Sequence, residues 1–133
     1  MVITIGFFSG MAEEFKADGI AVNALWPMTT IYTAAMEMLG GGKAVAKGCR
    51  TPEIMADAAY VILSKDSGTF SGNFAVDEDI LRSEGCSDFS NYLVVPGTKD
   101  SELILDGYLE SSNYGRQLMD GSAKNKGMKR GQK

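Results

Sequence analysis

Two glycine-rich stretches carry the residue types that could bind a phosphate group. Residues 6–12, Gly-Phe-Phe-Ser-Gly-Met-Ala, follow the strand-like Val-Ile-Thr-Ile of residues 2–5. They nearly form the glycine turn that places a pyrophosphate at a helix N-terminus. Ala12 replaces the last glycine, and no acidic residue closes a second strand about 20 positions later. We therefore interpret this stretch as the approach to an ordinary helix, with the phosphate turn as the alternative.

The second glycine stretch and an acidic cluster are also interpreted as structural. Gly-Gly-Gly-Lys-Ala at residues 40–44 has Ala44 where a phosphate-binding loop needs Ser or Thr for magnesium, so we expect a flexible helix end. The cluster of Asp77, Glu78 and Asp79 lacks the spacing and the glycine of an EF-hand calcium loop. We expect it to be a solvated strand end and predict no metal site.

Histidine and cysteine offer little chemistry here. The sequence contains no His, which excludes His-based nucleophile triads, His general bases and His zinc ligands. Cys49 and Cys86 lie 37 positions apart and form no CxxC motif. We predict two unpaired thiols, with a disulfide or a metal-binding pair as the alternative.

Hydrophobic periodicity predicts a helix and then a buried strand in the first part of the chain. Four residues within residues 7–18 share one apolar helix face: Phe8, Met11, Ala12 and Phe15. Gly19 follows at the position of a left-handed C-cap. Residues 20–26 are short, largely apolar and closed by Pro27, which is typical of a parallel strand buried on both faces.

The following residues predict two more helices and a second strand. Residues 34–39 are expected to form a short helical segment. Thr-Pro-Glu at residues 51–53 favours the start of a longer helix, whose apolar stripe contains Ile54, Ala58, Val61 and Ile62. Residues 70–76 have the character of a strand. We expect the order helix, strand, short helix, helix, strand, with the two strands adjacent and parallel.

Charge is distributed unevenly along the chain. Residues 1–120 contain 8 basic and 17 acidic side chains, whereas residues 121–133 contain 5 basic and none acidic. The acidic body argues against a nucleic-acid partner, and no apolar run approaches the about 18 residues of a membrane span. We predict that the basic tail is disordered.

Three stretches of the chain follow one another in a recognisable order. Residues 10–36 contain Gly-Met-Ala-Glu-Glu-Phe, then Asn-Ala-Leu-Trp-Pro and a Thr-rich loop. Residues 50–63 begin Arg-Thr-Pro-Glu-Ile-Met, and residues 69–81 contain Thr-Phe-Ser-Gly-Asn-Phe-Ala-Val. Over residues 10–97 this pattern resembles the C-terminal half of the short-chain dehydrogenase/reductase family. The resemblance implies an α/β fold: a partial Rossmann-type C-terminal lobe with parallel strands.

The resemblance also implies a cofactor site in the loop after the first strand. Asn23 and Pro27 match the end of the family's strand. Pro27, Ile31 and Thr33 are the cofactor-binding residues that it predicts, with the backbone of Ile31 and the hydroxyl of Thr33 holding the carboxamide of NAD or NADP. Met28 stands where many members have Gly, and Thr33 lies one residue later than the commonest spacing.

The family's catalytic Tyr-x-x-x-Lys motif does not occur in this sequence. Lysine stands four positions after none of the five tyrosines: Tyr32, Tyr60, Tyr92, Tyr108 and Tyr114. We predict the C-terminal part of an NAD(P)-dependent oxidoreductase that has no catalytic residue, is inactive alone and does not bind NAD or NADP by itself. The alternatives are a non-catalytic dimerisation or binding module and a cofactor-independent enzyme using Tyr and acidic residues.

The boundaries and partners follow from the same reasoning. Residues 1–97 are predicted to form the partial dehydrogenase domain, and residues 98–133 a poorly ordered extension. The expected partner is a second copy or a full-length family member, and neither a nucleic acid nor a membrane span is expected. A peroxisomal or mitochondrial location is implied by the resemblance alone.

Overall fold

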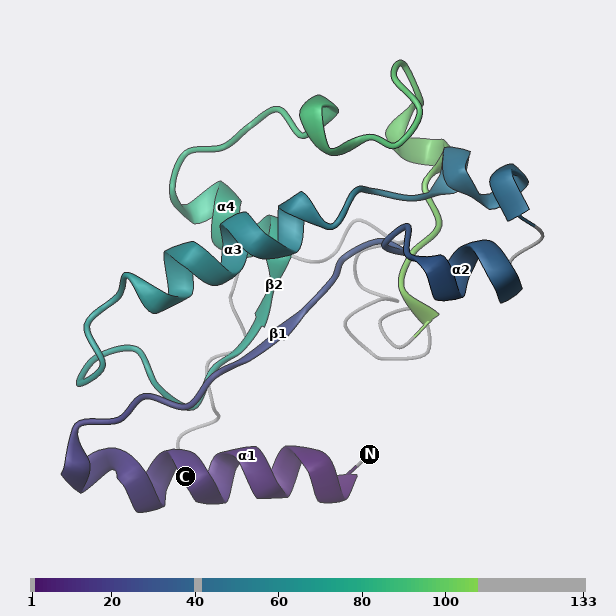
Figure 1. Cartoon of the computed structure of the whole chain (residues 1–133). Helices are drawn as coiled ribbons and strands as arrows, with labels where there is room; N and C mark the ends of the chain where they lie inside the picture. The colour runs from purple at the N-terminus through teal and green to yellow at the C-terminus, as the bar shows by residue number, and fades with distance from the viewer. Residues whose placement is uncertain (1, 40–41, 108–133) are drawn as a thin grey trace.

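The computed structural model describes residues 2–39 and 42–107, which contain four α-helices and two strands (Figure 1). The elements are α1 (Val2–Glu14), β1 (Ala24–Trp26), α2 (Ala34–Leu39), α3 (Glu53–Leu63), β2 (Phe74–Val76) and α4 (Asp77–Ser83). Short 3₁₀ helices span Phe15–Asp18, Gly42–Gly48, Ser90–Tyr92 and Asp100–Glu102. The predicted order of helix, strand, short helix, helix and strand is confirmed. The predicted disordered tail, residues 121–133, lies outside the described residues.

The strands β1 and β2 pair in parallel. Ala24 lies opposite Phe74 and Trp26 lies opposite Val76. The two strands run between α1 and α3 in Figure 1. The α/β fold class with adjacent parallel strands is therefore confirmed, and the carboxyl ends of both strands meet at the same edge of the sheet.

Both strands are shorter than the predicted residues 20–26 and 70–76. The backbone N–H of Val22 donates to the hydroxyl of Ser71 at 3.0 Å, so a side chain replaces a regular ladder partner there. Ile20 is 52% exposed. The prediction that the whole first segment is buried on both faces is wrong, because its first residues lie before the paired region.

Helix α1 begins at Val2, so the strand-like interpretation of residues 2–5 is wrong. Within the described residues β1 and β2 pair only with each other, and a strand at residues 2–5 would have no ladder partner. Residues 6–12 lie inside α1, which excludes the glycine turn. Gly19 adopts the predicted left-handed conformation, with φ of 71°. None of the described helices is long and apolar enough to cross a membrane.

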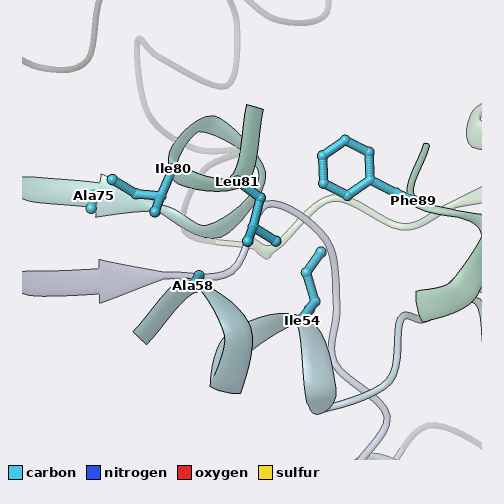
Figure 2. Packing of buried hydrophobic residues seen from close by; sticks show 6 residues of the cluster. All are labelled: Ile54, Ala58, Ala75, Ile80, Leu81 and Phe89. Carbon is cyan, nitrogen blue, oxygen red and sulfur yellow. The ribbon is translucent and has the colours of Figure 1, made fainter. Parts of the chain in front are cut away.

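A small apolar core lies between α3, β2 and α4 (Figure 2). Its buried members come from these three elements and the segment that follows: Ile54, Ala58, Ala75, Ile80, Leu81 and Phe89. Ile54 and Ala58 are fully buried and represent the predicted apolar stripe of α3. This core fixes α3 and α4 against the strand whose end forms part of the candidate site.

Replacement of Ile54 by Val should lower the free energy of unfolding by about 1 kcal/mol, because it removes one buried methylene group. Ile20→Val makes the same chemical change at a site that is 52% exposed, and should change stability by less than about 0.5 kcal/mol. Urea denaturation followed by circular dichroism measures both. Equal losses at the two sites would contradict the assignment of Ile54 to the core.

Candidate functional site

The loop at residues 27–33 leaves the sheet at the carboxyl end of β1, directly beside the end of β2. In open parallel sheets this edge is where ligands bind, because loops leave neighbouring strands there and enclose a crevice. The 27–33 loop contains all three predicted cofactor-binding residues: Pro27, Ile31 and Thr33. Its conformation is set by hydrogen bonds to three other parts of the chain.

The first support comes from the end of β2. The backbone N–H of Met28 donates to Oδ1 of Asp77 at 2.7 Å, and the N–H of Glu78 donates to the same oxygen at 2.7 Å. Asp77 is fully buried. This carboxyl group therefore joins the start of the loop to the start of α4.

The second support is the backbone of Arg50. The N–H of Tyr32 donates to the carbonyl of Arg50 at 2.8 Å, and the N–H of Arg50 donates to the carbonyl of Thr30 at 3.0 Å. Ile31 lies opposite Arg50 in this parallel bridge. Because the flanking residues make the bonds, the amide and carbonyl of Ile31 point away from Arg50.

The third support is a segment at residues 103–106, here called the crossing segment. The N–H of Thr30 donates to the carbonyl of Ile104 at 2.8 Å, and the N–H of Ile104 donates to the carbonyl of Gly48 at 2.8 Å. A Cβ at Gly48 would lie 2.5 Å from the Ile104 side chain, so the close approach favours glycine. Part of the predicted extension at residues 98–133 thus pairs with the body, and the boundary at residue 97 stays a prediction.

The structure places the three predicted residues differently within the loop. Pro27 and Ile31 are half-buried, whereas Thr33 is exposed. The hydroxyl of Thr33 accepts the N–H of Met36 at 3.3 Å and so caps α2. A hydroxyl also carries one donor, which this bond leaves unused. The role of Pro27, Ile31 and Thr33 in cofactor binding stays a prediction.

The loop fits the nicotinamide end of a dinucleotide cofactor. A carboxamide needs both donors and acceptors, and the amide and carbonyl of Ile31, which point away from Arg50, supply both kinds together with the Thr33 hydroxyl. The described residues offer no comparable site for the pyrophosphate of the cofactor, because the glycine residues 6 and 10 of the candidate phosphate-binding turn lie inside α1. The described residues therefore fit the carboxamide and not the pyrophosphate.

The acidic cluster after β2 is not the predicted solvated strand end. Asp77 is 0% and Glu78 is 6% exposed, and both belong to the first turn of α4. Burial raises the pKa of Asp77 to about 6, against the effect of its two backbone hydrogen bonds, which lower it. In the described part of the chain no group of acidic or cysteine side chains is arranged to hold a metal ion. Cys49 and Cys86 are free thiols, as predicted.

Glu78 is neutralised by two arginines. Nε of Arg50 donates to Oε1 of Glu78 at 2.9 Å, and Arg82 bonds Oε2 at 3.1 Å. Nη1 of Arg50 also donates to the carbonyl of Phe89 at 3.0 Å. A cavity of about 250 Å³ lies between this ion-pair cluster, the 27–33 loop and the crossing segment. Arg50, Glu78 and Arg82, which line this cavity, are thus held in ion pairs with one another.

A tyrosine–carboxylate pair lies outside the loop. The hydroxyl of Tyr92 donates to Oδ2 of Asp57 at 2.7 Å. This hydrogen bond raises the pKa of Tyr92 to about 12. A general acid or base works best with a pKa near the operating pH. The pair therefore gives no support to a cofactor-independent enzyme built on Tyr and acidic residues.

Comparison with known proteins shows which proteins this chain resembles in sequence. No family model matches the chain. Hydroxysteroid dehydrogenase-like protein 2 of Xenopus tropicalis is 56% identical over 103 residues, which are 77% of this chain and 23% of that protein. The human protein of the same name is 52% identical over 103 residues, 77% of this chain and 24% of its own length.

Two solved structures share the fold. A short chain dehydrogenase of Mycobacterium thermoresistibile superposes with a TM-score of 0.66 at 45% identity, over 77% of this chain and 35% of that one. A putative dehydrogenase from Xanthomonas campestris gives 0.68 at 42% identity, over 80% of this chain and 38% of that one. This chain is related to the short-chain dehydrogenases. It spans about a quarter of the length of the two hydroxysteroid dehydrogenase-like proteins named above and little more than a third of the two solved chains.

Sequence reasoning missed two supports of the loop. In the sequence Asp77 stands out only as part of an acidic cluster, although its position directly after a strand parallel to β1 is a usable signal. The crossing segment left no such signal, because Leu103–Leu105 is too short for a periodic pattern.

Proposed function

We propose that this chain forms the nicotinamide side of an NAD(P)-dependent short-chain oxidoreductase and has no turnover on its own. The observation that supports it is a loop at the carboxyl edge of two parallel strands, in which the amide and carbonyl of Ile31 point away from Arg50 and the Thr33 hydroxyl follows two positions later. The similarity to hydroxysteroid dehydrogenase-like protein 2 supports the same assignment. The substrate would be a carbonyl compound or an alcohol, and the location peroxisomal or mitochondrial, as the family resemblance implies.

The residues of the chain would bind and orient, and would not transfer a proton. The bound cofactor supplies the hydride chemistry. The amide and carbonyl of Ile31 and the hydroxyl of Thr33 would hold its carboxamide and fix the orientation of the ring. Correct positioning can contribute roughly 7–11 kcal/mol to lowering a barrier. A missing proton donor costs another 10²–10⁴-fold or so, and no tyrosine here has the lysine that the family pairs with it.

The test is a pair of ligand titrations on the full chain, followed by ¹H–¹⁵N NMR. We do not expect this chain to hold the whole cofactor stably, because it has no site for the pyrophosphate, but the loop should bind the nicotinamide half weakly. Nicotinamide mononucleotide at high concentration should therefore shift the amides of Ile31 and Thr33, whereas adenosine monophosphate, which represents the other half of the cofactor, should leave them unchanged. Thr33→Ala should weaken the nicotinamide response, because it removes the hydroxyl. Thr33→Ser keeps the hydroxyl and the cap of α2, and should restore the response.

An activity assay and a control variant outside the 27–33 loop complete the test. Thr69→Ala removes an exposed threonine hydroxyl that donates to the carbonyl of Asp66. This variant should bind nicotinamide mononucleotide like the wild type. A dehydrogenase assay with NADH and NADPH should give only the background rate. No shift at Ile31 and Thr33 would overturn the binding proposal, and turnover lost in Thr33→Ala would overturn the proposed inactivity.

A second candidate function is a non-catalytic dimerisation or binding module. The observations that favour it are the two-stranded sheet, which has no further strand in the described residues, and two large apolar side chains exposed on α3. Tyr60 is 73% and Leu63 84% exposed. The partner would be a second copy or a full-length relative. Sedimentation equilibrium of the wild type and of Leu63→Glu decides it: a dimer that the variant separates supports the module, and a wild-type monomer contradicts self-association.

A further inference from the structure

We propose that Asp77 is the positioning residue of the 27–33 loop, fixing the start of the loop to the end of β2 through the N–H of Met28. The proposal rests on the proposed function for its consequence, namely that a displaced loop binds nicotinamide less well. It concerns a residue that does not itself contact the cofactor.

The geometry sets Asp77 apart from its acidic neighbours. One oxygen, Oδ1, accepts two backbone N–H groups at 2.7 Å each, one from Met28 and one from Glu78. These two donors are 50 residues apart in the chain but lie at the ends of adjacent strands. A carboxyl group between two backbone amides fixes the separation of the two strand ends.

Burial makes this tether strong. Asp77 is 0% exposed, and its second oxygen, Oδ2, has no hydrogen-bond partner among the described residues. Water therefore does not compete for Oδ1 as it would at the surface, and a hydrogen bond to a buried, charged acceptor is stronger than an ordinary one. Loss of this acceptor would leave the amide of Met28 unpaired in a dry environment.

The other two supports of the loop bond different backbone groups. Arg50 bonds Thr30 and Tyr32, further along the loop. The crossing segment bonds Thr30 and, through the N–H of Asp106, the carbonyl of Met28 at 3.1 Å. The N–H of Met28 is held by Asp77. Asp77 therefore joins the start of the loop to the end of β2, whereas the crossing segment joins it to residues 103–106.

Amide hydrogen exchange on the full chain tests the tether. In Asp77→Ala the amide of Met28 should exchange about 10- to 100-fold faster, measured against the amides of α3 in the same sample. Asp77→Asn keeps an acceptor oxygen and should stay close to the wild type. Asp79→Ala removes the carboxyl two positions further along α4 and is the matched control. Uniformly faster exchange in α3 and at Met28 would indicate a purely structural role and overturn the proposal.

A second measurement does not require Asp77→Ala to fold. In the wild type, the amide shifts of Met28 and Glu78 should titrate together with a midpoint near pH 6, and Asp77→Asn should abolish both titrations. A flat Met28 shift would overturn the proposal even if the variants are unfolded.

Ligand binding then separates this proposal from the proposed function. The shifts that nicotinamide mononucleotide induces at Ile31 and Thr33 should weaken in Asp77→Ala and persist in Asp79→Ala. If the wild type itself shows no such shifts, the proposed function fails, while exchange and titration at Met28 still decide the role of Asp77. If Asp77→Ala binds like the wild type, the positioning role is overturned.

Discussion

Replacement of Arg50 by Ala is expected to lower the free energy of unfolding by about 3–5 kcal/mol. Arg50 is only 2% exposed, and its guanidinium bonds both the carboxylate of Glu78 and the carbonyl of Phe89. Without it, Glu78 stays buried with Arg82 as its remaining partner. A buried charge that loses a partner costs far more than the intact pair contributes, because desolvation is no longer compensated.

An exposed ion pair provides the control for Arg50. Lys47 and Glu102 lie 2.7 Å apart, but their side chains are 59% and 38% exposed. Lys47→Ala should therefore cost at most about 1 kcal/mol. Urea denaturation of Arg50→Ala, Glu78→Ala and the double variant completes the test, and the double variant should lose less than the sum of the singles. A loss at Arg50 as small as that at Lys47 would contradict the buried pair.

The stability of the wild type should fall relative to Asp77→Asn as the pH rises from about 4 to about 6. Burial raises the pKa of Asp77 from 3.8 to about 6, so over this interval the folded state keeps a proton that the unfolded state has released. The stabilisation is complete below pH 4 and lost above pH 6. The difference between the two pKa values corresponds to about 3 kcal/mol.

Urea midpoints of the two proteins, measured from pH 4 to pH 7, test this dependence. Exposed carboxylates such as Glu84, whose pKa is lowered by a hydrogen bond from Lys65, lose their contribution as the pH falls. These groups are common to both proteins and cancel in the difference. A difference that does not change with pH would show that Asp77 titrates near its ordinary value.

Much of the local structure could be predicted from residue types and their spacing. The apolar stripe containing Ile54 predicted α3, Gly19 predicted the end of the first helical segment, and Pro27 marked the end of β1. These features depend on neighbours within a few positions in the chain, so periodicity and turn chemistry capture them. The family resemblance likewise depended on the order of such local stretches.

Errors arose where a residue's environment is made by distant parts of the chain. The residue types at 2–5 favour a strand, but a strand requires a ladder partner, and only the tertiary arrangement shows that β1 and β2 pair with each other and not with these residues. The ends of the predicted strands were wrong for the same reason, since Val22 bonds a hydroxyl 49 residues away.

The sequence by itself determined the α/β class, the parallel strand pair and the position of the 27–33 loop, because these follow from local hydrophobic pattern and the chirality of crossover connections. Only the tertiary structure decided that Asp77 is buried beneath that loop and that the crossing segment pairs with it. The hydrogen bond between Met28 and Asp77 joins residues 49 positions apart. The neighbouring residues in the chain do not show whether an acidic side chain is exposed or buried. The segments that bury Asp77 are distant in the chain and come together only when the protein folds.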